Sequence, residues 1–208
     1  LFGCAKSLEI KNINILFQRL SFVGELGWEL YIPINDSKEI YKLIINAGKN
    51  YGLIHAGRLA MDIMRMEKGY LHWGHDISPE ENPYEANLGF TVKLNKKYDF
   101  IGKAKLQEVK DTPKKQFVML TLVDSKPGEP LLLHDEPIYL NNKIVGETTS
   151  GNFSFCYNKN IAFGYINSNI DKNNVKDNFF EIEVAKNKYK AHIELEPLHD
   201  PKNILIKS

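Results

Sequence analysis

The sequence predicts an α+β protein, in which a mixed α/β domain over residues 1–112 precedes a small all-β, barrel-like domain over residues 113–208. Two segments with helical periodicity lie among β-rich segments in the first part of the chain. After Pro113, short β-rich runs follow one another at steady spacing, with turn residues between them. The polar segment Lys110–Pro113 separates the two patterns, and we therefore place a domain boundary there.

The first part begins with a predicted strand pair and a helix. Ile13–Phe22 and Trp28–Ile34 are rich in β-branched and aromatic residues, and they flank Val23–Gly27, where two glycines mark a turn. Asp36-Ser37 offers an N-cap, and apolar residues at helical spacing continue until Gly48. We therefore expect two strands joined by a glycine turn and followed by an amphipathic helix.

A second amphipathic helix is predicted over Ala56–Met66, with Gly69 as its stop signal. Its apolar face includes Leu59, and Arg58, Asp62 and Arg65 stand off that face. Lys68 follows at the end where the helix dipole favours a cation. Three further elements are expected, namely a loop at Leu71–Pro83, a strand at Phe90–Leu94 and a short helix at Asp99–Val109.

The second part predicts six short strands that form a small barrel or sandwich. Asn141-Asn142 is a candidate two-residue hairpin turn between two of them. The predicted strands are Gln116–Val123, Glu136–Leu140, Lys143–Thr149, Ile161–Ile166, Phe179–Val184 and Lys188–Leu195.

Composition excludes several classes of partner. The 208 residues contain 27 Lys plus Arg and 26 Asp plus Glu, and a net charge of +1 is too small for binding dominated by phosphates, so we expect no nucleic acid. No apolar run reaches the roughly 18 residues of a membrane helix, so we expect a soluble protein with no membrane partner. Cys4 and Cys156 form no disulfide framework, which favours a reducing, cytoplasmic compartment.

The chain starts at Leu1 without a Met, and we expect it to be a piece of a longer protein.

Three other features have alternative interpretations. His72, His75 and Asp76 could supply three metal ligands, but they lie in a predicted loop, and no second ligand set accompanies them, so we expect no metal site. Cys156 lies among aromatic residues in Phe153–Tyr157 and is expected to be a buried, inert thiol. His192 and His199 are scattered along the chain and suggest packed or exposed side chains without a site.

The turn Gly24-Glu25-Leu26-Gly27-Trp28-Glu29 is the most unusual local feature. Strand alternation sends Trp28 and Leu30 to one face and Glu29 and Tyr31 to the other. On spacing alone, Glu29 is more often a solvated charge than a site residue. In a pocket, however, its two acceptor oxygens would match a planar pair of N–H groups, such as the amide-plus-amine edge of a pterin or the fork of an arginine.

These segments resemble the aminomethyltransferase family of the glycine cleavage T-protein, and within it the folate-binding module of sarcosine and dimethylglycine dehydrogenases. The matching segments run in order along nearly the whole chain: Ser21–Tyr31, Arg65–Tyr70, Trp73–Ile77, Pro83–Phe90, Val92–Leu94, Asp99–Lys103, Gly128–Pro130, Val145–Gly151, Ile161–Ile166 and Pro197–Pro201.

The resemblance implies a fold of three domains around a central opening that holds tetrahydrofolate, of which this chain is the later part. It implies tetrahydrofolate as the cofactor, with FAD only in a possible upstream domain. The implied partners are folate, a small amine-derived one-carbon donor and the N-terminal part of the same module. The family's key Asp lies upstream of the glycine turn and is not on this chain, so we expect no catalytic residue here.

Three site residues are implied by the resemblance. The second acid of the family's Gly-Glu-x-Gly-x-Glu turn, which holds the pterin edge, falls on Glu29. A pocket-lining Tyr of the family falls on Phe22, which keeps the ring and lacks the hydroxyl. The position of an Arg that T-proteins place near the folate falls on Met61, a departure that favours the dehydrogenase branch.

The expected function is therefore tetrahydrofolate-dependent one-carbon (aminomethyl) transfer, as the folate module of a sarcosine or dimethylglycine dehydrogenase-type protein. Two alternatives remain. The first is a non-catalytic folate-binding or regulatory protein of the same fold. The second is a structural domain that holds a flavin enzyme together.

Overall fold

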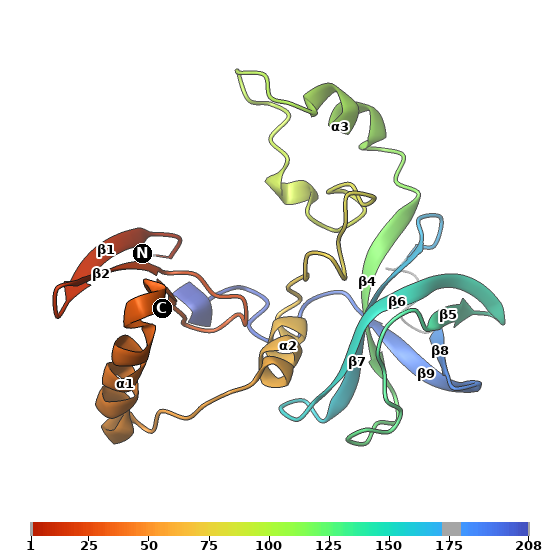
Figure 1. The fold of residues 1–208 in the computed structure, drawn as a ribbon. Helices are drawn as coiled ribbons and strands as arrows, with labels where there is room; N and C mark the ends of the chain where they lie inside the picture. The colour runs from red at the N-terminus through yellow and green to blue at the C-terminus, as the bar shows by residue number, and fades with distance from the viewer. Residues whose placement is uncertain (1, 172–179, 208) are drawn as a thin grey trace. The chain divides into compact units, whose positions relative to one another are not determined.

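The computed structural model describes residues 2–171 and 180–207. The chain forms two compact units (Figure 1). Leu1–Tyr70 and His199–Ser208 make up the first, here called the sheet unit, and Leu71–Leu198 make up the second, here called the barrel unit. The chain thus leaves the sheet unit after Tyr70 and returns to it at His199. The predicted boundary at residues 112–113 stays a prediction, although the first barrel strand begins just after it, at Lys115.

The sheet unit contains a three-stranded antiparallel sheet in the order β1-β2-β3. The strands are β1 (Ala5–Ile10), β2 (Ile13–Gln18) and β3 (Glu29–Tyr31). Two of them lie where we predicted strands, with shorter bounds, and their turn contains the predicted glycines. Strand β1 was not predicted, because its sequence AKSLEI is half polar and most of its residues are exposed.

Both predicted helices are present, as α1 (Ser37–Gly48) and α2 (Arg58–Glu67). Short 3-10 helices lie at Ile34–Asp36, Lys49–Tyr51 and Leu205–Lys207. The Asp36 side chain makes no capping hydrogen bond at α1. The small apolar core of this unit includes Ile15, Ile40, Met66 and Ile206.

The polarity expected for α2 is partly wrong. Arg65 is 1% exposed, whereas the apolar Leu59 is 79% exposed. Arg65 can be buried because its Nε donates to Asp62 Oδ1 at 2.8 Å and its guanidinium donates to the Tyr70 carbonyl at 3.2 Å. Charged residues are thus part of the interior of this unit.

The barrel unit begins with an irregular segment, as predicted for Leu71–Pro83. The predicted strand at Phe90–Leu94 is wrong: Gly89–Thr91 is a 3-10 helix in which the Thr91 amide donates to the Leu88 carbonyl. Phe90 is 73% exposed, so its β propensity has no neighbouring strand to pack on. The short helix is confirmed as α3 (Lys103–Val109), which follows Gly102 in a left-handed conformation.

Six antiparallel strands then close into a barrel in the order β4-β7-β6-β5-β8-β9 (Figure 1). This confirms the predicted all-β barrel, and Asn141 and Asn142 both adopt the left-handed conformation that a tight hairpin needs. The strands are β4 (Lys115–Leu122), β5 (Pro137–Leu140), β6 (Lys143–Ser154), β7 (Lys159–Asn167), β8 (Phe180–Val184) and β9 (Asn187–Glu194).

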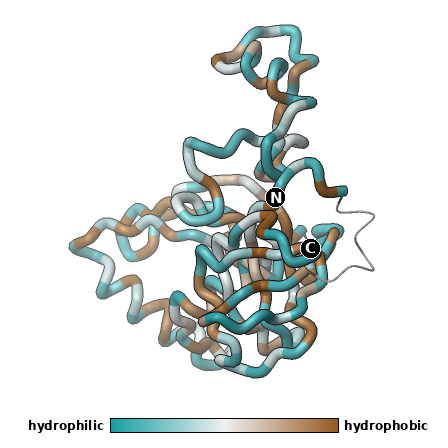
Figure 2. Tube along the Cα trace, turned by 90° about the vertical axis from the view of Figure 1, so that its right-hand side faces the viewer, coloured by the Kyte–Doolittle hydropathy of each residue, from teal (hydrophilic) through white to brown (hydrophobic). Residues whose placement is uncertain are grey.

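Side chains from all six strands fill the barrel interior. Leu120, Ile138, Phe180 and Ile182 are fully buried. Short hydrophobic and hydrophilic stretches are interspersed along the trace of the chain (Figure 2). Phe179, with which the predicted fifth strand of this domain began, lies outside the described residues. Within the described residues, no helix is long and apolar enough to cross a membrane.

The expected burial of Cys156 is wrong. The thiol is exposed, in the turn between β6 and β7, and the neighbouring Phe155 is 77% exposed. The aromatic residues around it belong partly to the end of a strand and partly to a turn, so they do not form one buried run. Cys4 is also a free, exposed thiol.

Candidate functional site

The turn between β2 and β3 depends on its two glycines. Gly24 has φ +80°, and a Cβ atom there would lie 2.3 Å from Cγ of Lys68, so only glycine fits. The Gly27 carbonyl accepts a hydrogen bond from the Arg19 guanidinium at 3.2 Å. That guanidinium also lies 5.6 Å from the ring centroid of Trp28. The turn is therefore fixed at both of its glycines.

Glu29 is the first residue of β3, opposite Gln18 of β2. Its carboxylate is exposed and accepts a hydrogen bond from the Tyr31 hydroxyl at 3.0 Å. The shared face of Glu29 and Tyr31 confirms the predicted alternation. The hydrogen bond to Glu29, followed by the charge of that carboxylate, raises the pKa of Tyr31. Among the described residues no cation pairs with Glu29, so its acceptor oxygens are available to N–H donors.

The other two predicted site residues also lie in the sheet unit. Phe22 is half-buried and lies two residues before Gly24 in the connection between β2 and β3, which Glu29 follows as the first residue of β3. Met61 lies on α2 and is 40% exposed. Phe22 and Glu29 thus come from one connection and the strand that follows it, whereas Met61 comes from a separate element.

A buried ion pair packs against this turn. The Nζ atom of Lys68 donates to Oδ2 of Asp200 at 2.9 Å and to the Asp200 carbonyl at 2.6 Å. Burial opposes ionisation of Asp200, but hydrogen bonds from Lys68 and from the backbone amides of Ile204 and Ile206 outweigh it and hold its pKa well below the ordinary range. Burial, followed by the charge of Asp200, raises the pKa of Tyr70.

Sequence reasoning missed this pair. The predicted preference of Lys68 for the C-terminal end of α2 involves only local dipoles, and its partner lies 132 residues away. His199 was likewise given no role, yet its Nε2 lies 2.7 Å from Oε1 of Glu25, and its amide donates to the Glu67 carbonyl at 2.9 Å. No local sequence signal connects these positions. The only sequence indication that these residues matter was that Arg65–Tyr70 and Pro197–Pro201 are both among the segments that resemble the family.

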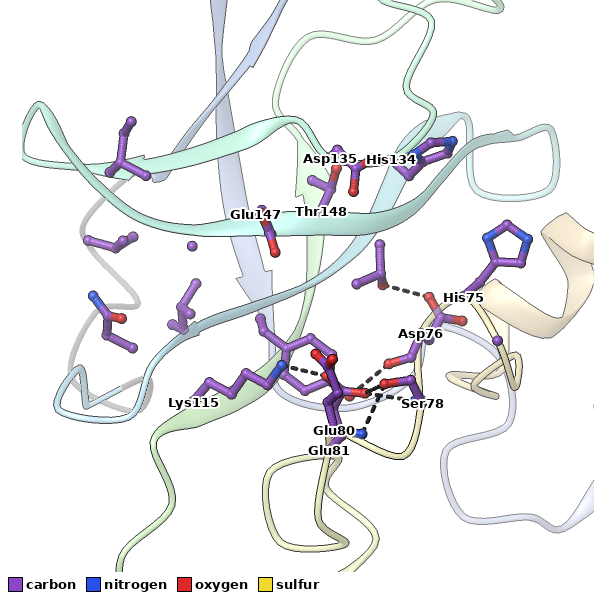
Figure 3. A pocket seen from close by; sticks show the side chains of 18 residues that line it. His75, Asp76, Ser78, Glu80, Glu81, Lys115, His134, Asp135, Glu147 and Thr148 are labelled. Atoms are coloured by element: carbon purple, nitrogen blue, oxygen red, sulfur yellow. Dashed lines mark hydrogen bonds and ion pairs between the residues drawn. The ribbon is translucent and has the colours of Figure 1, made fainter.

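The barrel unit contains a cavity of about 560 Å³. One side is formed by the loop that carries His75, Asp76, Glu80 and Glu81, and the other by barrel segments that include His134, Glu147 and Thr148 (Figure 3). Lys115 extends across it, with its Nζ 2.5 Å from Glu81 Oε1 and 4.7 Å from the ring centroid of Tyr165. Burial opposes ionisation of Glu81, but hydrogen bonds from Lys115 and Ser78 lower its pKa overall.

Asp76 anchors the loop to the barrel. It is 1% exposed, and its Oδ1 accepts hydrogen bonds from the hydroxyls of Thr149 at 2.6 Å and Ser150 at 2.8 Å. Its Oδ2 accepts the His72 amide at 2.8 Å, and its carbonyl accepts the Tyr165 hydroxyl at 2.8 Å. Burial, followed by the charges of Glu81, Asp76 and Glu85, raises the pKa of Tyr165. Asp76 therefore joins the loop to the barrel, and its buried carboxylate is not accessible as a base.

The histidines of the same loop are close to one another. The rings of His72 and His75 stack with centroids 5.0 Å apart, and His134 lies 6.4 Å from His75. Across residues 2–171 and 180–207, no group of three or more His, Cys, Asp or Glu side chains could hold a metal ion.

Two family models match the two parts of this architecture. The GCVT N-terminal domain matches residues 1–96, and the glycine cleavage T-protein C-terminal barrel domain matches residues 115–200. The chain belongs to the glycine cleavage T-protein family, also called the aminomethyltransferase family.

Similar proteins include dehydrogenases and aminomethyltransferases. Human mitochondrial dimethylglycine dehydrogenase is 40% identical over 195 residues, which cover 93% of this chain and 22% of that protein. The aminomethyltransferase of Symbiobacterium thermophilum is 35% identical over 167 residues, covering 79% of this chain and 44% of that protein. The chain thus spans about a fifth of the dehydrogenases and less than half of the aminomethyltransferase.

The solved structure of glycine cleavage system aminomethyltransferase T from Bartonella henselae has the same fold, with a TM-score of 0.79. It is 22% identical to this chain, and the match covers 94% of this chain and 52% of that protein. The predicted α+β class and the barrel are thereby confirmed.

Proposed function

We propose that this chain forms the folate-binding part of a tetrahydrofolate-dependent one-carbon (aminomethyl) transfer module. The dehydrogenase relatives at 35–40% identity support a sarcosine or dimethylglycine dehydrogenase-type parent protein. The observation that carries the proposal is the Glu29 carboxylate, which is exposed, free of any cationic partner among the described residues, and held on a sheet by its pairing with Gln18.

The acceptor oxygens of Glu29 fit the N–H groups of a pterin. Tyr31 donates to one oxygen of Glu29, which leaves further acceptor sites for the amide and amine N–H groups of a pterin edge. Phe22 offers a half-buried ring beside the turn, and its lack of a hydroxyl limits it to apolar contact. Tetrahydrofolate, when bound, supplies the amines that accept the one-carbon unit.

The role of this chain is then to bind and orient. Holding folate against an incoming donor carbon can reduce a barrier by roughly 7–11 kcal/mol through proximity alone. Acid–base help would come from the family's key Asp, which lies upstream of the matched turn. We propose that residues outside this chain complete the pocket over the exposed Glu29. FAD would belong only to a possible upstream domain, and the cytoplasmic location stays a prediction because the named dehydrogenase relatives are mitochondrial.

Turnover of the full-length protein tests the proposal. With tetrahydrofolate and an amine donor, Glu29→Ala should raise KM for tetrahydrofolate at least tenfold, because a charged hydrogen bond is worth about 1.5–3 kcal/mol. Glu29→Gln should show an intermediate effect, since it keeps one acceptor oxygen. An unchanged KM in Glu29→Ala would exclude Glu29 from the folate site.

One observation favours a second candidate, a non-catalytic folate-binding or regulatory protein. Phe22 stands where the family's pocket carries a Tyr, so a hydrogen-bonding hydroxyl is lost. The same assay separates the two: tetrahydrofolate binding without methylenetetrahydrofolate formation favours the second candidate. Phe22→Tyr should then restore turnover if the missing hydroxyl is the cause.

A further inference from the structure

The Lys68–Asp200 ion pair is a costly feature for a unit with so small an apolar core. The two side chains are 1% and 4% exposed. Burying charges is unfavourable unless geometry and hydrogen bonding are excellent, so a buried pair is weak evidence for stability, and defining one local geometry is an alternative role for it. The geometry it defines lies at the glycine turn.

Lys68 contacts the turn through its aliphatic stem. At Gly24, a Cβ atom would lie 2.3, 2.6 and 2.7 Å from Cγ, Cβ and Cδ of Lys68, so stem and backbone are in direct contact. Because Asp200 fixes the ammonium end, the stem has little freedom to move away. Gly24 lies between Phe22 and Glu29, the two residues proposed to contact the pterin.

Asp200 is itself fixed by its own segment. Its Oδ1 accepts the Ile204 amide at 2.7 Å, and its Oδ2 accepts the Ile206 amide at 3.3 Å. The preceding residue, His199, reaches the turn directly through Glu25 Oε1 at 2.7 Å. The segment at residues 199–207 therefore supports two consecutive turn residues, Gly24 through Lys68 and Glu25 through His199.

We infer that Lys68, Asp200 and His199 are positioning residues for folate: they hold the turn so that Phe22 and Glu29 keep the arrangement that the pterin requires. None of them needs to touch the ligand. The inference rests on the proposed function, since it gives the C-terminal segment a role in the Glu29 site.

The test uses the full-length protein and four variants, Lys68→Met, Asp200→Asn, their double variant and His199→Gln. For each, the Kd for tetrahydrofolate is measured by calorimetry at a temperature well below the melting temperature, which is measured separately. We expect Kd to rise about tenfold in Lys68→Met and Asp200→Asn, no further in the double variant, and about threefold in His199→Gln. Lys11→Met, which breaks the exposed Lys11–Glu39 pair of the same unit, should leave Kd unchanged.

Turnover separates positioning from a purely structural role. Positioning raises KM for tetrahydrofolate and leaves kcat at saturating folate and KM for the amine donor unchanged. A purely structural role lowers the melting temperature and leaves Kd and KM unchanged, and this result would overturn the inference. His199→Gln keeps the test decisive if Lys68→Met does not fold, because the His199 and Glu25 side chains in contact are partly exposed, at 22% and 42%.

Glu29→Ala, measured alongside, distinguishes a failure of the positioning role from a failure of the proposed folate site. If it weakens folate binding while the variants of Lys68, Asp200 and His199 do not, only the positioning role fails. If Glu29→Ala also leaves Kd unchanged, the proposed folate site itself fails.

Discussion

Charged side chains in the sheet unit fix the backbone where an apolar core is small. Arg65 supports the chain after α2 through the Tyr70 carbonyl, Arg19 supports the turn through Gly27, and Lys68 supports it through Gly24. In each case the guanidinium or ammonium group donates to oxygen, and the stem of Lys68 also packs on the backbone at Gly24. Replacing any of them removes a hydrogen-bond donor.

Gly24→Ala should lower the free energy of unfolding by more than the cost of placing alanine in a left-handed backbone conformation. Alanine at φ +80° costs about 1–2 kcal/mol, and the clash with the buried Lys68 stem adds about 1–3 kcal/mol. Gly52→Ala is the matched control, since Gly52 has φ +70° with nothing within 4 Å. Urea unfolding of both variants checks this, and equal losses in the two would contradict the packing of Lys68 on Gly24.

Asp200 should make stability depend on pH in the acid range. Its folded pKa lies below the ordinary value of 3.8, so the ionised group stabilises the fold above about pH 4, and this stabilisation is lost as the pH falls through the folded pKa. The free energy of unfolding of the wild type should therefore approach that of Asp200→Asn as the pH falls from 5 to about 2. A constant difference across that range would show that Asp200 is not preferentially ionised in the folded chain.

At the scale of elements, the loop at the start of the barrel unit is ordered by one carboxylate. Asp76 joins the loop to β6 through Thr149 and Ser150, and closes the loop on itself through the His72 amide. The segment has no helix or strand of its own, so these hydrogen bonds replace regular structure.

Asp76→Ala should lower the free energy of unfolding of the barrel unit by about 2–4 kcal/mol, because it leaves two hydroxyls and a backbone amide without their acceptor. Glu80→Ala is the matched control, as Glu80 lines the same cavity from the same loop with an exposed side chain, and it should change stability by less than about 0.5 kcal/mol. Thermal unfolding checks both, and equal effects would argue against Asp76 as the anchor.

Strands and turns were predictable where neighbouring residues in the sequence determine them. The barrel strands are short β-rich runs with turn residues between them, and Asn141-Asn142 favours a tight hairpin, so both appear in the sequence pattern. Strand β1 was missed because its residues are mostly exposed, and Phe90 was misassigned because β propensity needs a neighbouring strand. Glu29 was found through its turn, whereas the Lys68–Asp200 pair depends on the return of the chain to the sheet unit, which no local pattern shows.

At the scale of the whole molecule, the chain is not organised as two consecutive halves. It completes the barrel with β9 and then returns to the sheet unit at His199, where Ile206 is buried and Asp200 pairs with Lys68. The last ten residues therefore belong to the folding of the first seventy.

Deleting residues 199–208 from the full-length protein should loosen the sheet unit and spare the barrel. The deletion removes a buried Ile and the partner of a buried Lys, while all six barrel strands end before it. Hydrogen exchange should become faster by at least tenfold in residues 13–31 and 58–70 and stay unchanged in β4 and β7. Unchanged exchange in both regions would contradict the return of the chain to the sheet unit.

The affinity of the full-length protein for tetrahydrofolate, compared between Glu29→Ala and Glu9→Ala, tests the central claim most directly. Both glutamates are exposed on the same three-stranded sheet, and only Glu29 follows the glycine turn. We predict that Glu29→Ala weakens binding by about 10- to 150-fold, as the loss of 1.5–3 kcal/mol requires, and that Glu9→Ala has no effect. Equal affinities in the two variants would contradict a folate site built on Glu29.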